Sequence, residues 1–251
     1  MSKIKIIRHL IQLTFFIILI LPVFFLDTLW YGTYISGDLA GVELTDPLTA
    51  VELTFASKSL WVPLLLSAVP LTVIAILGGR LFCSFVCPLN ALLEILPNGK
   101  RLELDNRKWP LWSLLCVLIL ALLVGIPSFN VLSPVYALMR ILIFGFGIEA
   151  VLVLAVVIAG MIWGNKIWCR TICPLGAMYG ILGSKRLLRV VADENKCIKC
   201  GRCDTACSMG TSPCNSDFDS KFTCTNCGDC ISSCPKGAIS YKIKGLILGN
   251  M

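Results

Sequence analysis

The chain has 251 residues, of which 57% are hydrophobic and only 15% are charged, with a mean hydropathy of +0.83. A typical soluble domain is about 25% charged, so this composition excludes an ordinary soluble globule. It is also too apolar for a disordered chain. The single histidine, His9, excludes a bis-histidine haem and HExxH zinc chemistry within this chain.

Four apolar stretches are each long enough to cross a bilayer. They lie at about residues 6–26, 60–79, 110–127 and 141–164, and each approaches the ~20 residues that a membrane-spanning helix needs. The first stretch follows three basic residues, as a signal peptide does. It ends in a Phe-Phe-Leu-Asp run rather than a small-residue cleavage site, so we expect an uncleaved anchor.

Lys and Arg residues gather in the segments that we expect on one side of the membrane. These are residues 1–5, 80–109 and those after 164, together with Arg8 at the edge of the first helix. Of the 22 basic residues, only Lys58 and Arg140 lie elsewhere. By the positive-inside rule both termini are cytoplasmic, and the acidic loop 27–59 faces outward. The net charge of +7 is then a topology signal that also attracts anionic lipid, and we expect no nucleic-acid partner.

Eight of the 14 cysteines form two copies of the pattern C-x2-C-x2-C-x3-C. This is the spacing of bacterial two-cluster ferredoxins, in which three thiolates wrap one [4Fe–4S] cube and the fourth reaches the other. Structural zinc prefers two separated C-x2-C pairs, and disulfides are rare in the reducing cytoplasm. The predicted ligands are Cys197, Cys200, Cys203 and Cys234 for one cluster, and Cys224, Cys227, Cys230 and Cys207 for the other.

Four further cysteines belong to an internal repeat, because residues 79–96 and 165–182 match with an offset of 86. Each copy holds C-x3-C-P-L, with Cys83 and Cys87 in the first and Cys169 and Cys173 in the second. Residues i and i+4 share one face of a helix, and a parallel hairpin repeat brings all four thiols to one pseudo-twofold axis. Three interpretations remain open: a third metal centre, a redox-active dithiol, or a packing motif of small buried residues.

The two remaining cysteines give weaker signals. Cys214 lies in the linker between the two ferredoxin motifs, and we expect it at the surface or beside the ligands. Cys116 lies midway along the third apolar stretch, where a free cysteine behaves as a small apolar residue. Neither receives a functional role from the sequence.

Together, the four spans, the paired C-x3-C-P motifs and the two C-terminal cysteine motifs resemble the NapH type of membrane ferredoxin, a family that includes NosH and MauN. Shorter matches to the family are the run TDPL at 45–48 and the run SPV at 133–135, with Arg140 before the fourth span. The first cysteine motif departs from the family pattern, because Ser208 rather than proline follows Cys207.

This resemblance implies an electron-transfer subunit of a quinol dehydrogenase in the bacterial inner membrane, which is not a complete enzyme alone. Electrons would pass from quinol toward a periplasmic reductase pathway such as that of nitrate reductase. The implied partners are an iron–sulfur subunit, a c-type cytochrome, or both. The alternative is an accessory or maturation redox factor for a periplasmic metalloenzyme. The expected cofactors are two [4Fe–4S] clusters, with quinol as substrate and no haem in this chain.

Quinol oxidation needs an apolar slot, a proton acceptor and a nearby redox centre. Glu149, within or at the outer edge of the fourth span, is the clearest acidic candidate. Ionisable residues in a membrane are functional hypotheses by default, and a carboxylate whose pKa is raised by burial suits proton acceptance. Weaker candidates are Asp46, Glu52, Tyr31 and Tyr34 in the outside loop and His9 on the inner side.

The predicted fold is therefore a membrane α-helical bundle of four transmembrane helices over residues 1–185. A small α+β ferredoxin domain with two [4Fe–4S] clusters follows at 186–244, and a tail at 245–251. The small domain cannot bury a sufficient core, so its clusters should be integral to its folding. Arg186 and Arg189 are expected to hold the junction at the lipid surface.

Overall fold

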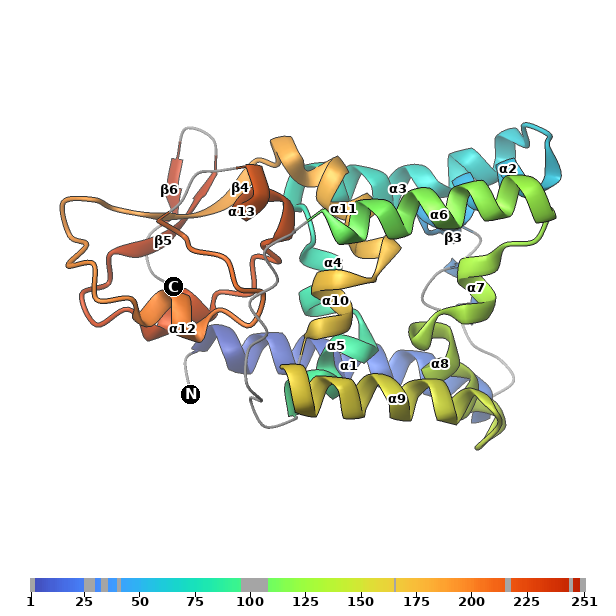
Figure 1. Cartoon of the computed structure of the whole chain (residues 1–251), viewed down its shortest axis with the longest axis horizontal. Coiled ribbons are helices and arrows are strands. Elements are labelled where there is room, and N and C mark those ends of the chain that lie inside the picture. The colour runs from blue at the N-terminus through green and yellow to red at the C-terminus, as the bar shows by residue number, and fades with distance from the viewer. Residues whose placement is uncertain are drawn as a thin grey trace.

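A computed structural model describes residues 3–24, 30–32, 36–39, 42–95, 108–164, 166–214, 218–243 and 246–248. The chain forms a helical part and a C-terminal part that lie end to end along the long axis (Figure 1). The helical part contains α1–α11, and the C-terminal part contains β4–β6 with the short helices α12–α14.

The first half of the helical part begins with one long helix and a small sheet. Its elements are α1 (Lys3–Phe24), β1 (Trp30–Gly32), β2 (Ser36–Leu39), β3 (Val42–Thr45), α2 (Pro47–Ser57), α3 (Val62–Gly78), α4 (Leu81–Phe85) and α5 (Pro88–Ile95). The three strands pair antiparallel in the order β1-β2-β3. Aspartate and proline explain the start of α2, since Asp46 caps the helix and Pro47 occupies its first turn.

The second half repeats this helix order. Its elements are α6 (Trp109–Val124), α7 (Ser128–Leu132), α8 (Pro134–Phe144), α9 (Glu149–Trp163), α10 (Ile167–Thr171) and α11 (Pro174–Leu182). The series α8–α11 follows the series α2–α5 helix for helix, and Ser133 caps α8 as Asp46 caps α2. In Figure 1, α3 and α6 lie along one side of the helical part and α1 and α9 along the other, with α4 and α10 running between them.

Two expectations about these helices are wrong. The stretch 141–164 is not one helix, because α8 ends at Phe144 before Gly145, whose φ is +88°, and α9 begins only at Glu149. The two cysteines of each C-x3-C-P motif also do not share a helix. Helix α10 ends at Thr171, and Cys173 instead caps α11, because a residue before proline avoids the helical region while proline suits the first turn of a new helix.

Helices α3, α6 and α9 are shorter than the expected spans that they match, whereas α1 has 22 residues. Within the described part of the chain, no helix combines the length and the apolar character required to span a membrane.

The two halves of the helical part interlock through their cysteine-motif helices. Helix α5 of the first half packs on α8 and α9 of the second, with Leu89 and Leu93 against Val135 and Met139. Helix α11 of the second half packs on α2, α3 and α6. Each half therefore completes the core of the other around the cysteine motifs.

The C-terminal part is an antiparallel sheet with short helices. It contains η1 (Gly183–Lys185), β4 (Leu188–Ala192), α12 (Arg202–Ala206), α13 (Phe218–Thr223), α14 (Asp229–Ser233), β5 (Ile239–Ile243) and β6 (Leu246–Leu248). Strand β4 pairs with β5 from Leu188↔Ile243 to Ala192↔Ile239. Residues 246–248, expected in a tail, form β6 and pair with β5.

The expected position of Arg186 at the lipid surface is wrong. Its side chain is buried, and Nη1 donates hydrogen bonds of 2.9 Å to the carbonyl oxygens of Lys221 and Cys224. Arg186 therefore ties the start of the C-terminal part to the backbone at Lys221 and Cys224.

Candidate iron–sulfur site

All eight cysteines of the two ferredoxin motifs line one cavity in the C-terminal part. The cavity has a volume of about 1050 Å³. Its cysteines are Cys197, Cys200, Cys203, Cys207, Cys224, Cys227, Cys230 and Cys234. The structure thus gathers every predicted cluster ligand around one hollow.

The first three cysteines of each motif lie on one loop. The first cysteine loop spans residues 197–203 and the second spans 224–230, and both have the same backbone conformation. Lys199 and Asn226 adopt positive φ values of 52° and 54°, and Gly201 and Gly228 follow at 71° and 81°. Two left-handed turns in three residues curl each loop so that its thiols face inward, and glycine adopts such turns without strain. Helices α12 and α14 start from these glycines and pack against each other.

The last cysteine of each motif stands at the end of its short helix. Cys207 follows α12 and Cys234 follows α14. The thiol of Cys230 lies within electrostatic reach of the thiols of Cys224, Cys227 and Cys207. This grouping joins three thiols of the second loop to the last thiol of the first, which is the predicted ligand set of one cluster.

Eight cysteine thiols around one cavity are a donor set that fits iron–sulfur clusters. Among the described residues, no group of three or more His, Cys, Asp or Glu side chains is arranged so as to hold a metal ion. Burial raises the pKa of the Cys227 thiol to about 11, so this thiol is protonated at neutral pH without metal. Iron binding would displace that proton, since a coordinating thiol is deprotonated outright.

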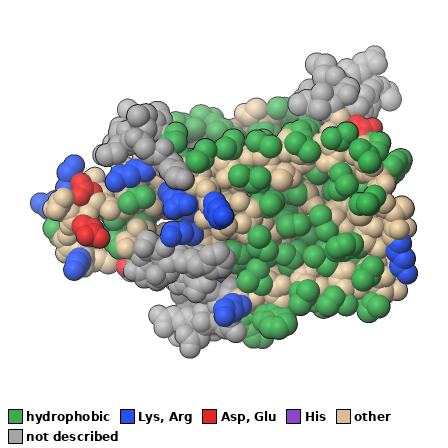
Figure 2. Space-filling view, turned by 90° about the horizontal axis from the view of Figure 1, so that it is seen from above, with side chains coloured by type: hydrophobic (Ala, Val, Ile, Leu, Met, Phe, Trp, Pro, Cys, Tyr) green, Lys and Arg blue, Asp and Glu red, His purple; other side chains and the backbone are tan. Residues whose placement is uncertain are grey.

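Exposed basic residues surround the cavity. Lys196, Lys199, Arg202 and Lys236 all line it. Figure 2 shows Lys and Arg side chains over the C-terminal part and its junction with the helical part, whose visible face is mainly hydrophobic. Positive charge beside a cluster favours its reduced form electrostatically and provides a surface for an acidic partner.

Cys214 is a ninth cysteine at this cavity, which the sequence did not assign as a ligand. It lines the hollow, and its thiol lies within hydrogen-bonding reach of Cys197 and Cys203. Cys214 follows Pro213 in an irregular linker, outside any regular cysteine spacing, so the sequence does not indicate a ligand. It reaches the cavity because the linker folds back over the first loop.

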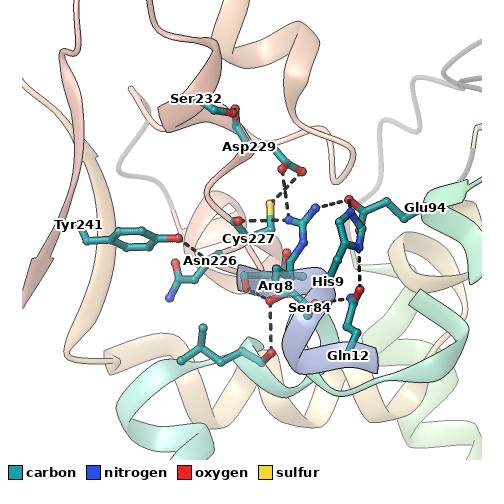
Figure 3. A network of polar contacts seen from close by, with 12 residues as sticks. Arg8, His9, Gln12, Ser84, Glu94, Asn226, Cys227, Asp229, Ser232 and Tyr241 are labelled. Atoms are coloured by element: carbon teal, nitrogen blue, oxygen red, sulfur yellow. Dashed lines mark hydrogen bonds and ion pairs between the residues drawn. The ribbon is translucent and has the colours of Figure 1, made fainter. Parts of the chain in front are cut away.

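Arg8 joins the second cysteine loop to the helical part, as Figure 3 shows. Its side chain is fully buried, and Nη1 donates to the carbonyl oxygen of Cys227 at 3.1 Å and to Oδ1 of Asp229 at 3.2 Å. Its Nη2 donates to Oε1 of Glu94 on α5. We expect Arg8 at the edge of the first span, whereas in the structure it is buried and joins the two parts of the chain.

Two more side chains fasten the same loop. Asn226 Nδ2 donates to the carbonyl oxygens of Gly78 and Leu188, both at 3.0 Å. Ser84, next to Cys83 on α4, donates from Oγ to the carbonyl oxygen of Thr225 at 2.9 Å. The second cysteine loop is therefore held directly against the first C-x3-C-P motif.

The structure brings the four C-x3-C-P cysteines together. The thiol of Cys83 lies within electrostatic reach of those of Cys87, Cys169 and Cys173. Cys87 and Cys173 are buried, while Cys83 and Cys169 are half-buried. The thiols of both copies of the repeat therefore lie near one another.

Glu149 stands apart from these cysteines in an ion pair. Its Oε1 lies 3.2 Å from Nη1 of Arg140, and Arg140 Nη2 also donates to the carbonyl oxygen of Asn130 at 3.1 Å. Glu149 is about one-third exposed at the start of α9. The pair therefore holds a partly accessible carboxylate at the turn between α8 and α9.

The weaker candidates for the proton acceptor lie in different surroundings. Asp46 is buried and accepts a hydrogen bond of 2.6 Å from the Tyr179 hydroxyl, although we expect these two residues on opposite sides of a membrane. Glu52 is buried, and its Oε1 accepts from the backbone N–H of Phe129 at 2.8 Å. Tyr34 and the side chain of Tyr31 lie outside the described residues.

His9 lies beside the Arg8 network. Its Nδ1 is 3.1 Å from Oε1 of Gln12, and its Nε2 is 3.9 Å from Oε1 of Glu94. Gln12 in turn donates to the carbonyl oxygen of Ser84 at 2.8 Å. These contacts give His9 a structural place between α1 and α5 (Figure 3).

Comparison with known proteins agrees with this arrangement of cysteines. A family model described as a 4Fe-4S binding domain matches residues 60–103 and 144–190, each containing one C-x3-C-P motif. The ferredoxin-type protein NapH of Escherichia coli is 34% identical over 234 residues, covering 84% of this chain and 81% of that protein. The chain belongs to the NapH family of ferredoxin-type proteins.

Other members of the NapH family are similar over shorter or more divergent alignments. The methylamine utilization ferredoxin-type protein MauN of Paracoccus denitrificans is 34% identical over 70% of this chain, which spans 65% of that relative. NapH of Haemophilus influenzae is 29% identical over 88% of this chain and 85% of its own length. No solved structure matches. These relatives and the 4Fe-4S model support an iron–sulfur electron-transfer role for this NapH-family chain.

Proposed function

We propose that this protein is a membrane-bound subunit that passes electrons from quinol through two [4Fe–4S] clusters toward a periplasmic reductase pathway. The observation that carries the proposal is the single cavity lined by all eight ferredoxin-motif cysteines. That cavity is fastened to the helical part by Arg8, Ser84 and Asn226. A soluble ferredoxin domain on a passive anchor needs no such buried connections.

The two ligand sets follow the crossed pattern of the loops. Cys197, Cys200, Cys203 and Cys234 hold one cluster, and Cys224, Cys227, Cys230 and Cys207 hold the other. Support comes from the grouping of Cys207 with the second loop and from the packing of α12 on α14. When bound, such clusters accept and release single electrons at potentials set by surrounding charge and hydrogen bonds.

Membrane embedding of the helical part is supported by its surface. Large exposed hydrophobic side chains follow α1, α3, α6 and α9, whereas from β4 onward only Ile198 and Ile243 are of this kind among the described residues. Apolar surface of this extent marks a membrane or protein contact. We assign it to lipid in the bacterial inner membrane, with both termini and the C-terminal part on the cytoplasmic side.

Quinol oxidation releases two electrons and two protons, and this chain supplies a candidate proton acceptor in Glu149. The ion pair with Arg140 orients its carboxylate, and its partial exposure gives the proton a route to water. The partners in the pathway are an iron–sulfur subunit, a c-type cytochrome, or both, which take electrons onward across the membrane.

Iron analysis of anaerobically purified protein tests the two-cluster carrier. Serine substitution of Cys200 and Cys227, one ligand of each predicted cluster, should lower the iron and labile-sulfide content and remove the matching EPR signals. Cys116→Ser, an exposed cysteine on α6, is the control and should retain both. Unchanged iron in the double variant would refute the assigned ligands.

The timing of the requirement separates electron transfer from maturation of a partner enzyme. The protein is depleted after the periplasmic reductase has matured, and quinol-dependent reductase activity is then followed. A relay subunit predicts that activity falls as the protein disappears, while activity with an artificial electron donor persists. Quinol-dependent activity that outlasts the protein would favour a maturation role instead.

A further inference from the structure

A fully buried carboxylate lies at the end of the helical part that is farthest from the C-terminal part. Glu52 on α2 is 0% exposed, and α2 lies at that end together with α7 (Figure 1). Its Oε1 accepts hydrogen bonds from the backbone N–H of Phe129 at 2.8 Å and from the Ser128 hydroxyl at 3.2 Å. Its Oε2 has no hydrogen-bond partner, and no cation pairs with either oxygen, within the described ranges.

The start of α7 accounts for one oxygen of Glu52 and leaves the other unexplained. Pro127 precedes α7 and offers no side-chain acceptor, so Oε1 of Glu52 serves an N–H group that the first turn leaves free. A glutamine would supply the same acceptor oxygen. Burial raises the pKa of the Glu52 carboxyl, because apolar surroundings disfavour its charged form. Glu52 therefore has the properties of a group that takes up and releases a proton.

Polar side chains of three helices lead from Glu52 to the surface. Thr49, one turn before Glu52 on α2, donates from Oγ1 to Oδ1 of Asn130 at 3.4 Å. Arg140 on α8 donates from Nη2 to the carbonyl oxygen of Asn130 at 3.1 Å and pairs through Nη1 with Glu149 at 3.2 Å. Asn130 is half-buried and the Glu149 side chain is 30% exposed. The two carboxylates thus stand on either side of α7, one buried and one in contact with water.

We propose that Glu52 is a second proton acceptor for quinol oxidation, and that Glu52 and Glu149 release the two protons at the end of the helical part away from the C-terminal part. Quinol loses two electrons and two protons and becomes quinone. The electrons reduce the ferredoxin-motif clusters one at a time, and each carboxylate takes one proton and passes it to water. This inference rests on the proposed function, because quinol is the source of the protons.

Release at that end adds charge separation to the electron-transfer role. The proposed topology places the C-terminal part at the cytoplasmic face and α2 and α7 at the outer face. Electrons would therefore leave the quinol toward one face while its protons leave toward the other. Arg140 is a positioning residue in this scheme, since it holds the Glu149 carboxylate beside α7.

The side of proton release tests the proposal on the intact protein. The protein is placed in lipid vesicles with its C-terminal part outward, as complete cleavage of that part by external protease verifies in a parallel sample. A pH indicator trapped in the lumen follows protons, and visible absorption follows electrons. A reduced quinol analogue should acidify the lumen in proportion to the bleaching of the clusters. Acidification confined to the external medium would overturn the proposal.

A second test uses Glu52→Gln, which keeps the size of the side chain and its acceptor oxygen for α7. Quinol oxidation should slow by about 10²–10⁴-fold, while iron content and unfolding temperature stay unchanged. Infrared difference spectra on addition of quinol should show a weaker carboxyl protonation band than in the intact protein. Glu43→Gln, an exposed residue on β3, is the control and should keep the band and the rate.

The outcomes of the two tests separate this inference from the proposed function. An unchanged rate or an unchanged carboxyl band in Glu52→Gln would overturn the role of Glu52. Intact, iron-loaded protein that dithionite bleaches and quinol does not would instead refute the proposed function itself.

Discussion

At the scale of single residues, buried charges connect distant parts of the chain. Arg8 illustrates this, since its partners Cys227 and Asp229 lie more than two hundred positions away in the sequence. A buried guanidinium with three oxygen partners is a joint between elements. The loop that carries Cys227 is consequently positioned by a residue of the first helix.

Arg8→Met should therefore destabilise the protein strongly. The substitution leaves the carboxylates of Glu94 and Asp229 and the carbonyl oxygen of Cys227 without the cation that they contact. Breaking a buried ion pair in this way lowers the free energy of unfolding by about 3–5 kcal/mol. Thermal unfolding of the purified protein, followed by loss of visible iron–sulfur absorption, measures the effect. Lys196→Met is the control, because its pairing with Asp193 is exposed and weak. Equal unfolding temperatures of the two variants would contradict the role of Arg8.

Glu149→Gln tests the proposed proton acceptor. The amide keeps the size of the side chain but cannot accept the proton, so quinol oxidation should slow by about 10²–10⁴-fold. Iron content should not change, because Glu149 lies away from all the candidate ligands. Steady-state quinol oxidation in vesicles gives the rate, with exposed Glu43→Gln as the control. An undiminished rate of quinol oxidation in Glu149→Gln would show that Glu149 is not the proton acceptor.

At the scale of elements, two short helices with equivalent caps complete the repeat. Asp46 and Ser133 both accept backbone N–H bonds at the starts of α2 and α8. Asp46 also accepts the hydroxyl of Tyr179 on α11 and so ties the first half to the second. The caps are equivalent in position, but only one of them carries a connection between the halves.

Asp46→Ala should accordingly cost more stability than Ser133→Ala. Loss of either cap lowers the free energy of unfolding by about 1 kcal/mol. Asp46→Ala also leaves the buried Tyr179 hydroxyl without its acceptor, which costs about 1–3 kcal/mol more. Chemical unfolding of both variants measures the difference. A double-mutant cycle with Tyr179→Phe isolates the Asp46–Tyr179 term. Equal losses in the two cap variants, with no coupling in the cycle, would show that the hydrogen bond adds nothing.

Some element boundaries could be predicted from the sequence, and others could not. The loops around the eight ferredoxin-motif cysteines follow from local spacing, because each loop is determined by a few neighbouring residues. The break at Gly145 is hidden inside an apolar run, so hydrophobicity alone merges α8 and α9. The runs Asp46-Pro47 and Ser133-Pro134 are helix-start signals that mark α2 and α8. The joining role of Arg8 has no local signal, since it depends on packing between the chain ends.

At the scale of the whole molecule, the two parts differ in what fills their interiors. From β4 onward, the buried hydrophobic side chains among the described residues are only Met209, Phe222, Ala238 and Ile239. The same part contains the cavity of about 1050 Å³ lined by cysteines. The helical part has an interlocked core, to which Phe222 also contributes. We therefore expect the stability of the C-terminal part to depend on bound iron–sulfur clusters more than that of the helical part does.

Removal of iron should unfold the two parts unequally. Anaerobic chelation should make residues 188–243 sensitive to protease, because binding energy of the metal is folding energy in so small a domain. The helical part should remain protected, because its two core clusters include only Phe222 from the C-terminal part among the described residues. Limited proteolysis with mass spectrometry reads out both parts. Uniform resistance after iron removal would show that the clusters are not structural.

We propose that quinol reduces iron–sulfur clusters held by this chain. The visible absorption of the purified protein in lipid vesicles, recorded under anaerobic conditions after addition of a reduced quinol analogue, tests this directly. We expect partial bleaching by quinol and complete bleaching by dithionite, with less bleaching by quinol in Glu149→Gln. Iron-loaded protein that dithionite bleaches and quinol leaves untouched would show that quinol is not the electron donor.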